Sequence, residues 1–441
     1  MTVPHPATTR PRSGLAHRLT QGLPDRLPRL LETYQDLHRH PELAFQETRT
    51  AAIVAAELRA LGWETTEGVG TTGVVGVLRS GEHGEGPVVL LRADMDGLPV
   101  REATGLAHAS TDTAVGRDGE PTPVMHACGH DLHVACLLGV VEQLTRHRDA
   151  WRGTVVAVFQ PAEETGEGAQ AMTGDGFLDR FPRPDVCLGQ HVGPFPVGMA
   201  VTRPGVLMSA SSSHRVSLFG RGGHGSSPES AVDPVVMAAA TVLRLQTVVS
   251  REIPAAQTVV LTVGSLHAGT AENIIPDEAE LKINIRVTDE QVRDRVLEAV
   301  VRIINAEAAA SGAPERPEIT PLSSLPLTVN DADATDRAVA GLRGALGEEA
   351  VVLLPAPLTG SEDFGVFGRE LGAPSVFWHF GGADPLAFAG RDLSSVRTEG
   401  LPKAVAANHS PHFAPVARPA LESGITAFLA VTAEWLAEPL A

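Results

Sequence analysis

The chain has 441 residues, 43% of them hydrophobic and 20% charged, which is typical of a soluble globular protein and too long for one ordinary core. A formal net charge of −18 and only 4% aromatic residues argue against nucleic acid or an anionic membrane as the main partner, because both select basic surfaces. Three scattered cysteines form no disulfide framework, and no secretory signal is visible, so we expect a cytoplasmic protein.

Residues 1–24 are rich in Pro, Thr and Arg, and we expect them to form a disordered or loosely attached leader. Leucines at helical spacing then predict a helix from about Leu27 that Pro41 ends, and residues 48–61 predict a second helix. Strands are predicted at 73–78 and at 87–91; the latter is an unbroken apolar run, as in a parallel strand buried on both faces.

Two acidic residues, Asp94 and Asp96, follow this buried strand directly. Open α/β sheets bind ligands at the carboxyl ends of their parallel strands. The two carboxylates could therefore orient metal-binding histidines, which commonly donate their second ring nitrogen to such groups. A polar turn is the plainer alternative.

The stretch 125–133 is the densest in metal-binding groups, with three imidazoles, a thiol and a carboxylate in nine residues. Thiolate and neutral imidazole are preferred ligands of transition metals, which makes Cys128 and His130 candidates. His126 could bind, orient a ligand or be structural. A helix is predicted next, from 133 to 147.

Two more predicted strands deliver candidate groups at their carboxyl ends. Strand 154–159 leads to Glu163 and Glu164, and strand 186–189 leads to His191. One glutamate could bind metal while the other acts as general base, although paired glutamates are often merely solvated. Because three strands each end in a possible ligand, we expect one shared site.

From about residue 205 the pattern changes to alternating strands with two helices, which indicates a small α+β unit. Near the C-terminus the sequence again shows an apolar strand-like run and a polar loop, as in the first part of the chain. We therefore predict an α/β domain, with a mixed, largely parallel sheet flanked by helices, that is interrupted by an inserted α+β domain. The predicted boundaries are 1–204 and 315–441 for the α/β domain and 205–314 for the insertion, with 315–330 as a linker or return strand.

Three residues of the insertion are candidates for substrate contacts. His224 lies in a glycine-rich loop and could donate to an oxyanion, although a lone loop histidine is usually inert. Asn273 could bind a substrate carboxylate or form only an Asx-turn. Arg286 could pair with an anionic substrate or lie on the surface.

His409, near the C-terminus, completes a candidate ligand set of mixed sulfur, nitrogen and oxygen donors. Five donors exceed what one tetrahedral zinc needs, and they suit two divalent cations. Zinc, manganese, cobalt and nickel all accept such donors. The set consists of Cys128, His130, Glu164, His191 and His409.

Together these motifs resemble the M20 family of metallopeptidases and amidohydrolases, in particular its branch of hippurate hydrolases and auxin-conjugate amidohydrolases. The resemblance rests on motifs in family order at 38–42, 92–96, 126–131, 160–164, 360–364 and 409–411. It implies a two-metal catalytic domain with the five ligands above, and Glu163 as base. It also implies that the inserted domain is a lid that dimerises and brings His224 and Asn273 to an active site. Residues 226–229 differ from those of many relatives, so the resemblance does not predict which side chains line the pocket near the lid.

We therefore expect metal-dependent hydrolysis of an N-acyl amino acid to a carboxylic acid and a free amino acid by a homodimer or higher homo-oligomer. In this mechanism Glu163 takes a proton from water, and His224 stabilises the oxyanion. A dipeptidase or other exopeptidase on the same fold is the nearest alternative. A non-catalytic metal-binding protein is a remote one.

Overall fold

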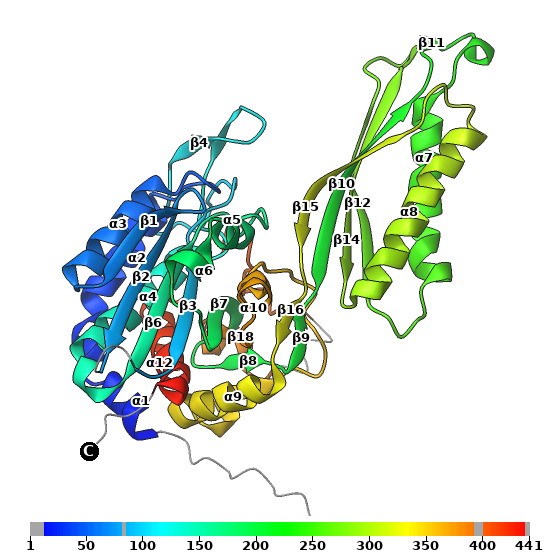
Figure 1. Ribbon diagram of the computed structural model, residues 1–441. Coiled ribbons are helices and arrows are strands. Elements are labelled where there is room, and N and C mark those ends of the chain that lie inside the picture. The colour runs from blue at the N-terminus through cyan, green and yellow to red at the C-terminus, as the bar shows by residue number, and fades with distance from the viewer. Residues whose placement is uncertain (1–12, 82–84, 392–399, 437–441) are drawn as a thin grey trace, which may run out of the picture. The chain divides into compact units, whose positions relative to one another are not determined.

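The computed structural model describes residues 13–81, 85–391 and 400–436, which fold as two compact units (Figure 1). The first unit comprises residues 1–205, 329–355 and 364–441, and the second comprises 206–328 and 356–363. The predicted fold class, an α/β part with an inserted α+β part, is confirmed.

The first unit is built on an eight-stranded mixed sheet. Its strands are β1 (Glu64–Val69), β2 (Gly73–Ser80), β3 (Val88–Asp94), β6 (Gly153–Gln160), β7 (Val186–Pro196), β8 (Ala200–Thr202), β17 (Val351–Leu353) and β18 (Ser375–Ala383). Their order is β1-β2-β6-β3-β7-β18-β8-β17. The four central strands β6, β3, β7 and β18 run parallel, whereas β1, β2 and β6 pair antiparallel. Short strands β4 (Thr113–Val115) and β5 (Pro121–Pro123) form a separate hairpin.

Helices cover both faces of this sheet. They are α1 (Ser13–Leu19), α2 (Leu27–Arg39), α3 (Thr48–Ala60), α4 (His130–Arg146), α5 (Gly168–Gly174), α6 (Phe177–Arg180), α9 (Ala332–Leu346), α10 (Gly365–Leu371) and α12 (Ala417–Trp435). Neighbouring residues of β18 show the two layers, because successive strand side chains point to opposite faces. Phe377 packs against Phe364 beside α10, with ring centroids 5.1 Å apart, and Trp378 packs against Phe428 of α12 at 5.4 Å.

The N-terminal segment is ordered from residue 13, so the predicted leader is wrong over 13–24. Helix α1 and a 3₁₀ turn at Leu23–Asp25 bury Leu15, Leu19 and Leu23 in the main core. These leucines remove enough apolar surface from water to hold the segment in place. Residues 1–12 lie outside the described residues.

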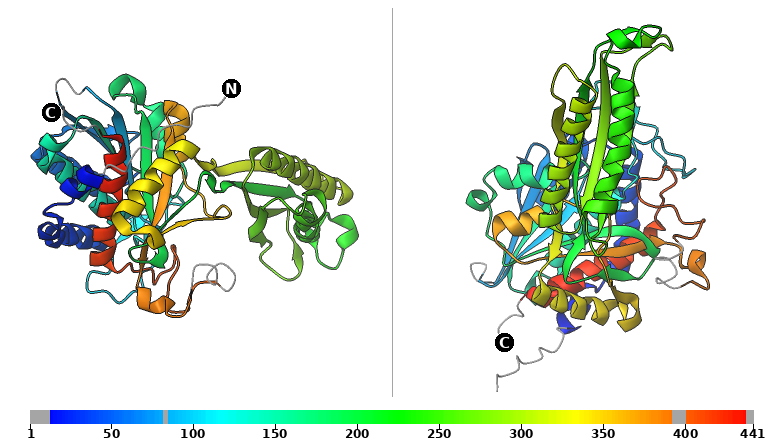
Figure 2. Two further views of the ribbon diagram at one scale, coloured as in Figure 1. Left: turned by 90° about the horizontal axis from the view of Figure 1, so that it is seen from below. Right: turned by 90° about the vertical axis from the view of Figure 1, so that its right-hand side faces the viewer.

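The second unit is a four-stranded antiparallel sheet with two long helices. Its order is β12-β14-β10-β15, and Figures 1 and 2 show α7 and α8 side by side along the sheet. Alternate residues of β14 are buried against these helices. Its elements are β9 (Gly205–Met208), β10 (Ala210–Phe219), β11 (Gly223–His224), α7 (Pro234–Thr247), β12 (Val259–Ala268), β13 (Ile274–Ile275), β14 (Glu278–Val287), α8 (Glu290–Ala310) and β15 (Glu318–Leu325); β16 (Thr328–Asn330) follows.

Strand β15 corrects the predicted boundary at 314. It pairs with β10 over seven residues, so the second unit continues to Thr328. Its proline and serines weakened the strand signal, and only pairing with a long neighbour stabilises it. In the described part of the chain, no helix has the length and apolarity needed to cross a bilayer.

Candidate metal centre

The candidate groups of the first unit converge on the carboxyl edge of the parallel strands. Asp94 is the last residue of β3, and the turn with Glu163 and Glu164 follows β6, its neighbour in the sheet. His191 lies within β7 rather than after it, because β7 continues to Pro196. This edge is where parallel sheets place ligands.

Helix α4 begins at His130, three residues earlier than predicted, and Gly129 makes that start possible. Gly129 has a φ of 86°, and a Cβ there would lie 2.4 Å from Val192 Cγ1. The residue must therefore be glycine both for its backbone conformation and for its close approach to β7. The first turn of α4 then brings His130 and His133 together, with ring centroids 5.4 Å apart.

Hydrogen bonds determine which ring nitrogen is left for a cation in two candidate ligands. His130 Nδ1 lies 3.2 Å from Asp96 Oδ1, and His191 Nδ1 donates to the Val192 carbonyl oxygen at 2.7 Å. In each ring the proton is thus directed to Nδ1, which leaves the Nε2 lone pair for a cation.

The remaining donors lie within a few ångströms of these two Nε2 atoms. His191 Nε2 is 3.4 Å from Cys128 Sγ, and His130 Nε2 is 3.8 Å from one oxygen each of Glu163 and Glu164. The other Glu164 oxygen is 3.3 Å from His409 Nε2. Glu164 thus belongs to two overlapping groups, one with Cys128 and His409 and one with His130 and Glu163.

Two buried atoms of this cluster test whether a cation fits. Within the described residues, His130 Nε2 and Glu164 Oε1 are buried without a hydrogen-bond partner, although they face each other. Such atoms are costly unless something satisfies them. Although burial lowers it, the Asp94 and Asp96 carboxylates raise the pKa of His130 to about 10, so the site demands positive charge there. A divalent cation would meet that demand, and the donor types suit it.

Burial and nearby carboxylates also affect the pKa of the Cys128 thiol. Burial, and then the carboxylates of Glu164, Glu163 and Asp94, raise its pKa well above the usual range. Without a cation the thiol therefore stays protonated and unreactive. This supports its use as a ligand, whose deprotonation a metal would drive, rather than as a nucleophile.

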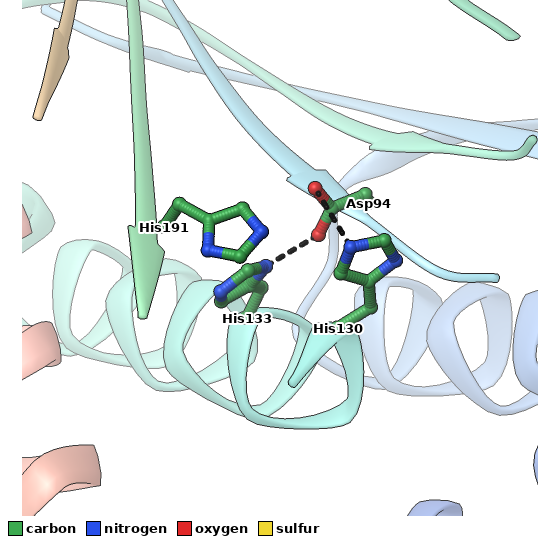
Figure 3. Close-up of side chains that lie close together, drawn as sticks. All are labelled: Asp94, His130, His133 and His191. Carbon is green, nitrogen blue, oxygen red and sulfur yellow. Dashed lines mark hydrogen bonds and ion pairs between the residues drawn. The ribbon is translucent and has the colours of Figure 1, made fainter. Parts of the chain in front are cut away.

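His133 was missed by the sequence analysis, and the structure gives it a positioning role (Figure 3). Its Nδ1 donates to Asp94 Oδ1 at 2.5 Å, and its Nε2 accepts from the Val192 N–H at 2.8 Å. Asp94 also pairs with the fully buried Arg92 at 2.6 Å. Asp94, His130, His133 and His191 lie close enough to suggest a metal group. However, both nitrogens of His133 are occupied, so it supports the ligands instead.

The C-terminal loop reaches the centre through Asn408. Its amide Nδ2 donates to the carbonyl oxygens of Cys128 and Val192, both at 3.2 Å, and the His409 N–H donates to the Ala127 carbonyl at 2.8 Å. His409 has a φ of 69°, which is uncommon outside glycine. These bonds hold His409 beside Glu164.

A second buried network of polar side chains joins the start of α4 to His38 and Glu102. His38 bridges Asp131, at 2.7 Å, and Glu102, at 3.1 Å, and although burial lowers it, these carboxylates raise the pKa of His38 to about 10. By contrast, burial lowers the pKa of His126 to about 4, and its ring makes no hydrogen bond to the described residues. His126 is thus a neutral buried ring, and its role stays open.

The candidates of the insertion belong to the second unit, where two of them are neighbours. Strand β11 pairs His224 with Ile274, and the backbone carbonyl oxygen of Asn273 accepts from the Gly225 N–H at 2.9 Å. Arg286 donates to the Thr359 carbonyl at 3.0 Å and to Ser361 Oγ at 3.2 Å, so it holds residues 356–363 within this unit. Substrate roles for all three stay predictions.

Comparisons with known proteins agree with this architecture. Residues 90–409 match the model of peptidase family M20/M25/M40. The chain is 37% identical over 332 residues to hippurate hydrolase of Campylobacter jejuni, covering 75% of this chain and 82% of that one. It is 34% identical over 355 residues to N-acetyl-L-cysteine deacetylase of Bacillus subtilis, covering 80% of each. A dinuclear metal-binding peptidase of the M20 family from Bacillus subtilis superposes with a TM-score of 0.69 at 28% identity, over 93% of this chain and 98% of that one.

Proposed function

The chain belongs to peptidase family M20/M25/M40, and from that membership we propose that it hydrolyses the amide bond of N-acyl amino acids. The products are a carboxylic acid and a free amino acid. Two relatives named for hydrolysis of hippurate and for deacetylation of N-acetylcysteine support this substrate class.

The different placement of two adjacent glutamates carries the proposal. Glu164 directs one oxygen toward His130 and the other toward His409, so it would help to hold cations together with these histidines. Glu163 has one oxygen 3.8 Å from His130 and is 5% exposed. A carboxylate at the edge of a cation site, beside its ligands, suits general base catalysis.

The cations would be held by Cys128, His130, Glu164, His191 and His409. When bound, they would polarise the amide carbonyl and lower the pKa of water. Zinc, manganese, cobalt and nickel are the candidate ions for this donor set.

The protein's own groups move the protons. Glu163 takes a proton from water as the water oxygen bonds to the carbonyl carbon, and it returns the proton to nitrogen as the C–N bond breaks. His224 Nδ1 accepts from the Ser226 N–H at 3.1 Å, which directs the ring proton to Nε2. That N–H suits stabilisation of the oxyanion. Asn273 and Arg286 would bind the carboxylate of the amino acid, and the second unit would provide the dimer contact.

A pocket at the same edge of the sheet suits the acyl group. Its volume is about 500 Å³, and it lies at the carboxyl ends of β7 and β18, next to the loop that carries His409. Gly193, Gly382, Ala404, Val405 and Phe413 contribute small and apolar parts of its wall, and polar groups also line the pocket, namely Asp384, Lys403, Ser410 and His412. Apolar walls with a few polar groups are usual for small-molecule sites.

The test is a substrate panel. Metal-stripped protein is reloaded with Zn²⁺, Mn²⁺, Co²⁺ or Ni²⁺ and given N-acetyl, N-benzoyl and longer N-acyl amino acids beside dipeptides, and released amino acid is measured. We expect N-acyl amino acids to be hydrolysed faster than dipeptides. Faster release from dipeptides would favour an exopeptidase instead.

Glu163→Gln provides the matched control, because it keeps the shape but cannot accept the proton. We expect kcat to fall at least about 100-fold while metal content stays at the wild-type level. Substantial activity in this variant would contradict the assigned base, and no hydrolysis with any cation would contradict the proposal as a whole.

A further inference from the structure

Four non-glycine residues in the described part of the chain have a positive φ. They are Phe45 (61°), Thr71 (94°), Ala162 (51°) and His409 (69°). Side chains other than glycine rarely adopt this region, and such residues persist only where surrounding contacts hold them. Their location therefore shows where the fold enforces a particular backbone geometry.

Two of the four strained residues, Phe45 and Ala162, donate to one carboxylate, that of Glu47, and the chain neighbour of a third donates to it as well. The N–H groups of Phe45 and Ala162 donate to its Oε1 at 3.0 and 2.8 Å. The hydroxyl of Thr72, which follows Thr71 in the turn between β1 and β2, donates to Oε2 at 2.5 Å. Glu47 thus joins three segments that are distant in sequence.

One of these segments carries the catalytic turn. Ala162 is followed by Glu163 and Glu164, whose N–H groups donate to the two oxygens of Asp96 at 3.1 and 3.0 Å. Three consecutive amides are therefore held by two carboxylates, Glu47 and Asp96. Ala162 alone would favour a negative φ. The directions of the Glu163 and Glu164 side chains therefore depend on the hydrogen bonds that hold this backbone.

Glu47 makes these bonds away from water, so the described backbone donors depend on its carboxylate rather than on solvent. Its side chain is fully buried, and no ion pair joins it to the described residues. Burial, and then the charge of Asp96, raise the pKa of Glu47 to about 7.

We propose that Glu47 is a positioning residue. It holds the 161–164 turn in its strained conformation, and this conformation keeps the side chains of Glu163 and Glu164 in their different orientations. This inference rests on the proposed role of Glu163 as base. It predicts that loss of Glu47 lowers turnover rather than substrate binding or metal content.

The experiment compares Glu47→Ala, Glu47→Gln and Glu47→Asp in the metal-loaded protein, with whichever substrate the wild type hydrolyses fastest. We expect Glu47→Ala to lower kcat at least about 30-fold, with KM within threefold and full metal content. Glu47→Gln should stay within about fivefold of wild type, because its amide oxygen still accepts both N–H bonds. Glu47→Asp, which is shorter by one methylene, should fall between them.

A second substitution tests the strain directly. Glycine adopts a positive φ without penalty, so Ala162→Gly should recover at least tenfold in kcat when combined with Glu47→Ala. Glu42→Ala is the matched control in the same segment. The Glu42 carboxylate accepts from the Arg49 and Thr50 N–H groups, both at 2.8 Å, and caps α3, so its loss should lower stability but leave kcat near wild type.

The proposal is overturned if Glu47→Ala affects kcat no more than Glu42→Ala, or if glycine at 162 recovers nothing. Should Glu47→Ala fail to fold, wild-type kcat in Glu47→Asp would overturn it equally. Because the substrate is chosen empirically, a preference for dipeptides would sink the proposed substrate class while leaving this test intact.

Discussion

His130 and His133 lie one turn apart at the start of α4, yet their partners assign them different tasks. The Nε2 of His130 faces Glu164 without a hydrogen-bond partner among the described residues, whereas both nitrogens of His133 are used by Asp94 and the Val192 amide. The same residue type is a candidate ligand at one position and a support at the other. The hydrogen-bond partners of each ring distinguish the two roles, which the residue type alone does not.

For His133 we predict that His133→Phe weakens metal affinity about 10- to 100-fold, the usual cost of losing a group that orients ligands. The phenyl ring fills the space but leaves Asp94 and the Val192 N–H unpaired. A competitive chelator titration measures the effect. His379→Phe is the matched control, because His379 is also buried and its Nδ1 has no partner among the described residues. Equal effects of the two substitutions would contradict the prediction.

Glu47 predicts a dependence of stability on pH in the metal-free protein. Its pKa is raised to about 7 in the folded state, above the ordinary value near 4.5, so the folded state holds the proton more tightly. Stability from this group is present at low pH and is lost as pH rises from about 4.5 to 7. Glu47→Gln should therefore be more stable than wild type at pH 8, by up to roughly 3 kcal/mol, and the gap should close near pH 5. Urea unfolding at both pH values measures this, and a gap that widens toward pH 5 would contradict it.

At the scale of elements, β7 contributes both to the metal centre and to the pocket, and the carboxyl end of β18 contributes to the pocket. His191 and Gly193 lie two residues apart on β7, and Gly193 lines the pocket. The loop 403–416 forms another part of the pocket wall and also carries His409. A substrate held at the centre would therefore extend along these strand ends.

This arrangement predicts how size selectivity should respond to Val405→Trp. The indole would occupy part of the roughly 500 Å³ volume, so kcat/KM for an N-benzoyl amino acid should fall at least tenfold more than for its N-acetyl analogue. Val115→Trp, at a valine 57% exposed on β4, is the matched control and should leave the ratio unchanged. A uniform loss for both substrates would argue against an acyl pocket here.

At the scale of the molecule, the candidate ligands all belong to the first unit, although they come from residues 128 to 409. A cation bound to them would link the α4 start, the β6 turn, β7 and the C-terminal loop. Binding to the folded state only raises apparent stability by mass action, by about 4 kcal/mol at a thousandfold excess over Kd. The second unit holds none of the five ligands.

We therefore expect chelation to abolish activity and to lower the unfolding temperature of the first unit by several degrees, with both restored by a divalent cation. In scanning calorimetry the transition of the second unit should stay in place if the two resolve. Na⁺ at equal ionic strength is the control. An unfolding temperature insensitive to chelator and to added cation would contradict a structural link through the metal.

Much of the fold followed from local patterns. The buried parallel strands, the α+β insertion and the family were predictable, because apolar periodicity and dense motifs are local properties of the chain. The N-terminal helix α1 was missed and the domain boundary at 314 was wrong, because both depend on distant partners: the core that covers Leu15 and Leu19, and the strand β10 that pairs with β15.

For the centre, the sequence alone determined which residue types could bind cations and that three strands would deliver them to one edge. Only the tertiary structure decided which nitrogen of His130 faces the cluster, that His133 supports rather than binds, and that Glu47 accepts hydrogen bonds from the turn before Glu163. The physical reason is that these properties depend on hydrogen bonds between residues tens to hundreds of positions apart. No local pattern of residues encodes such bonds; the folded backbone creates them.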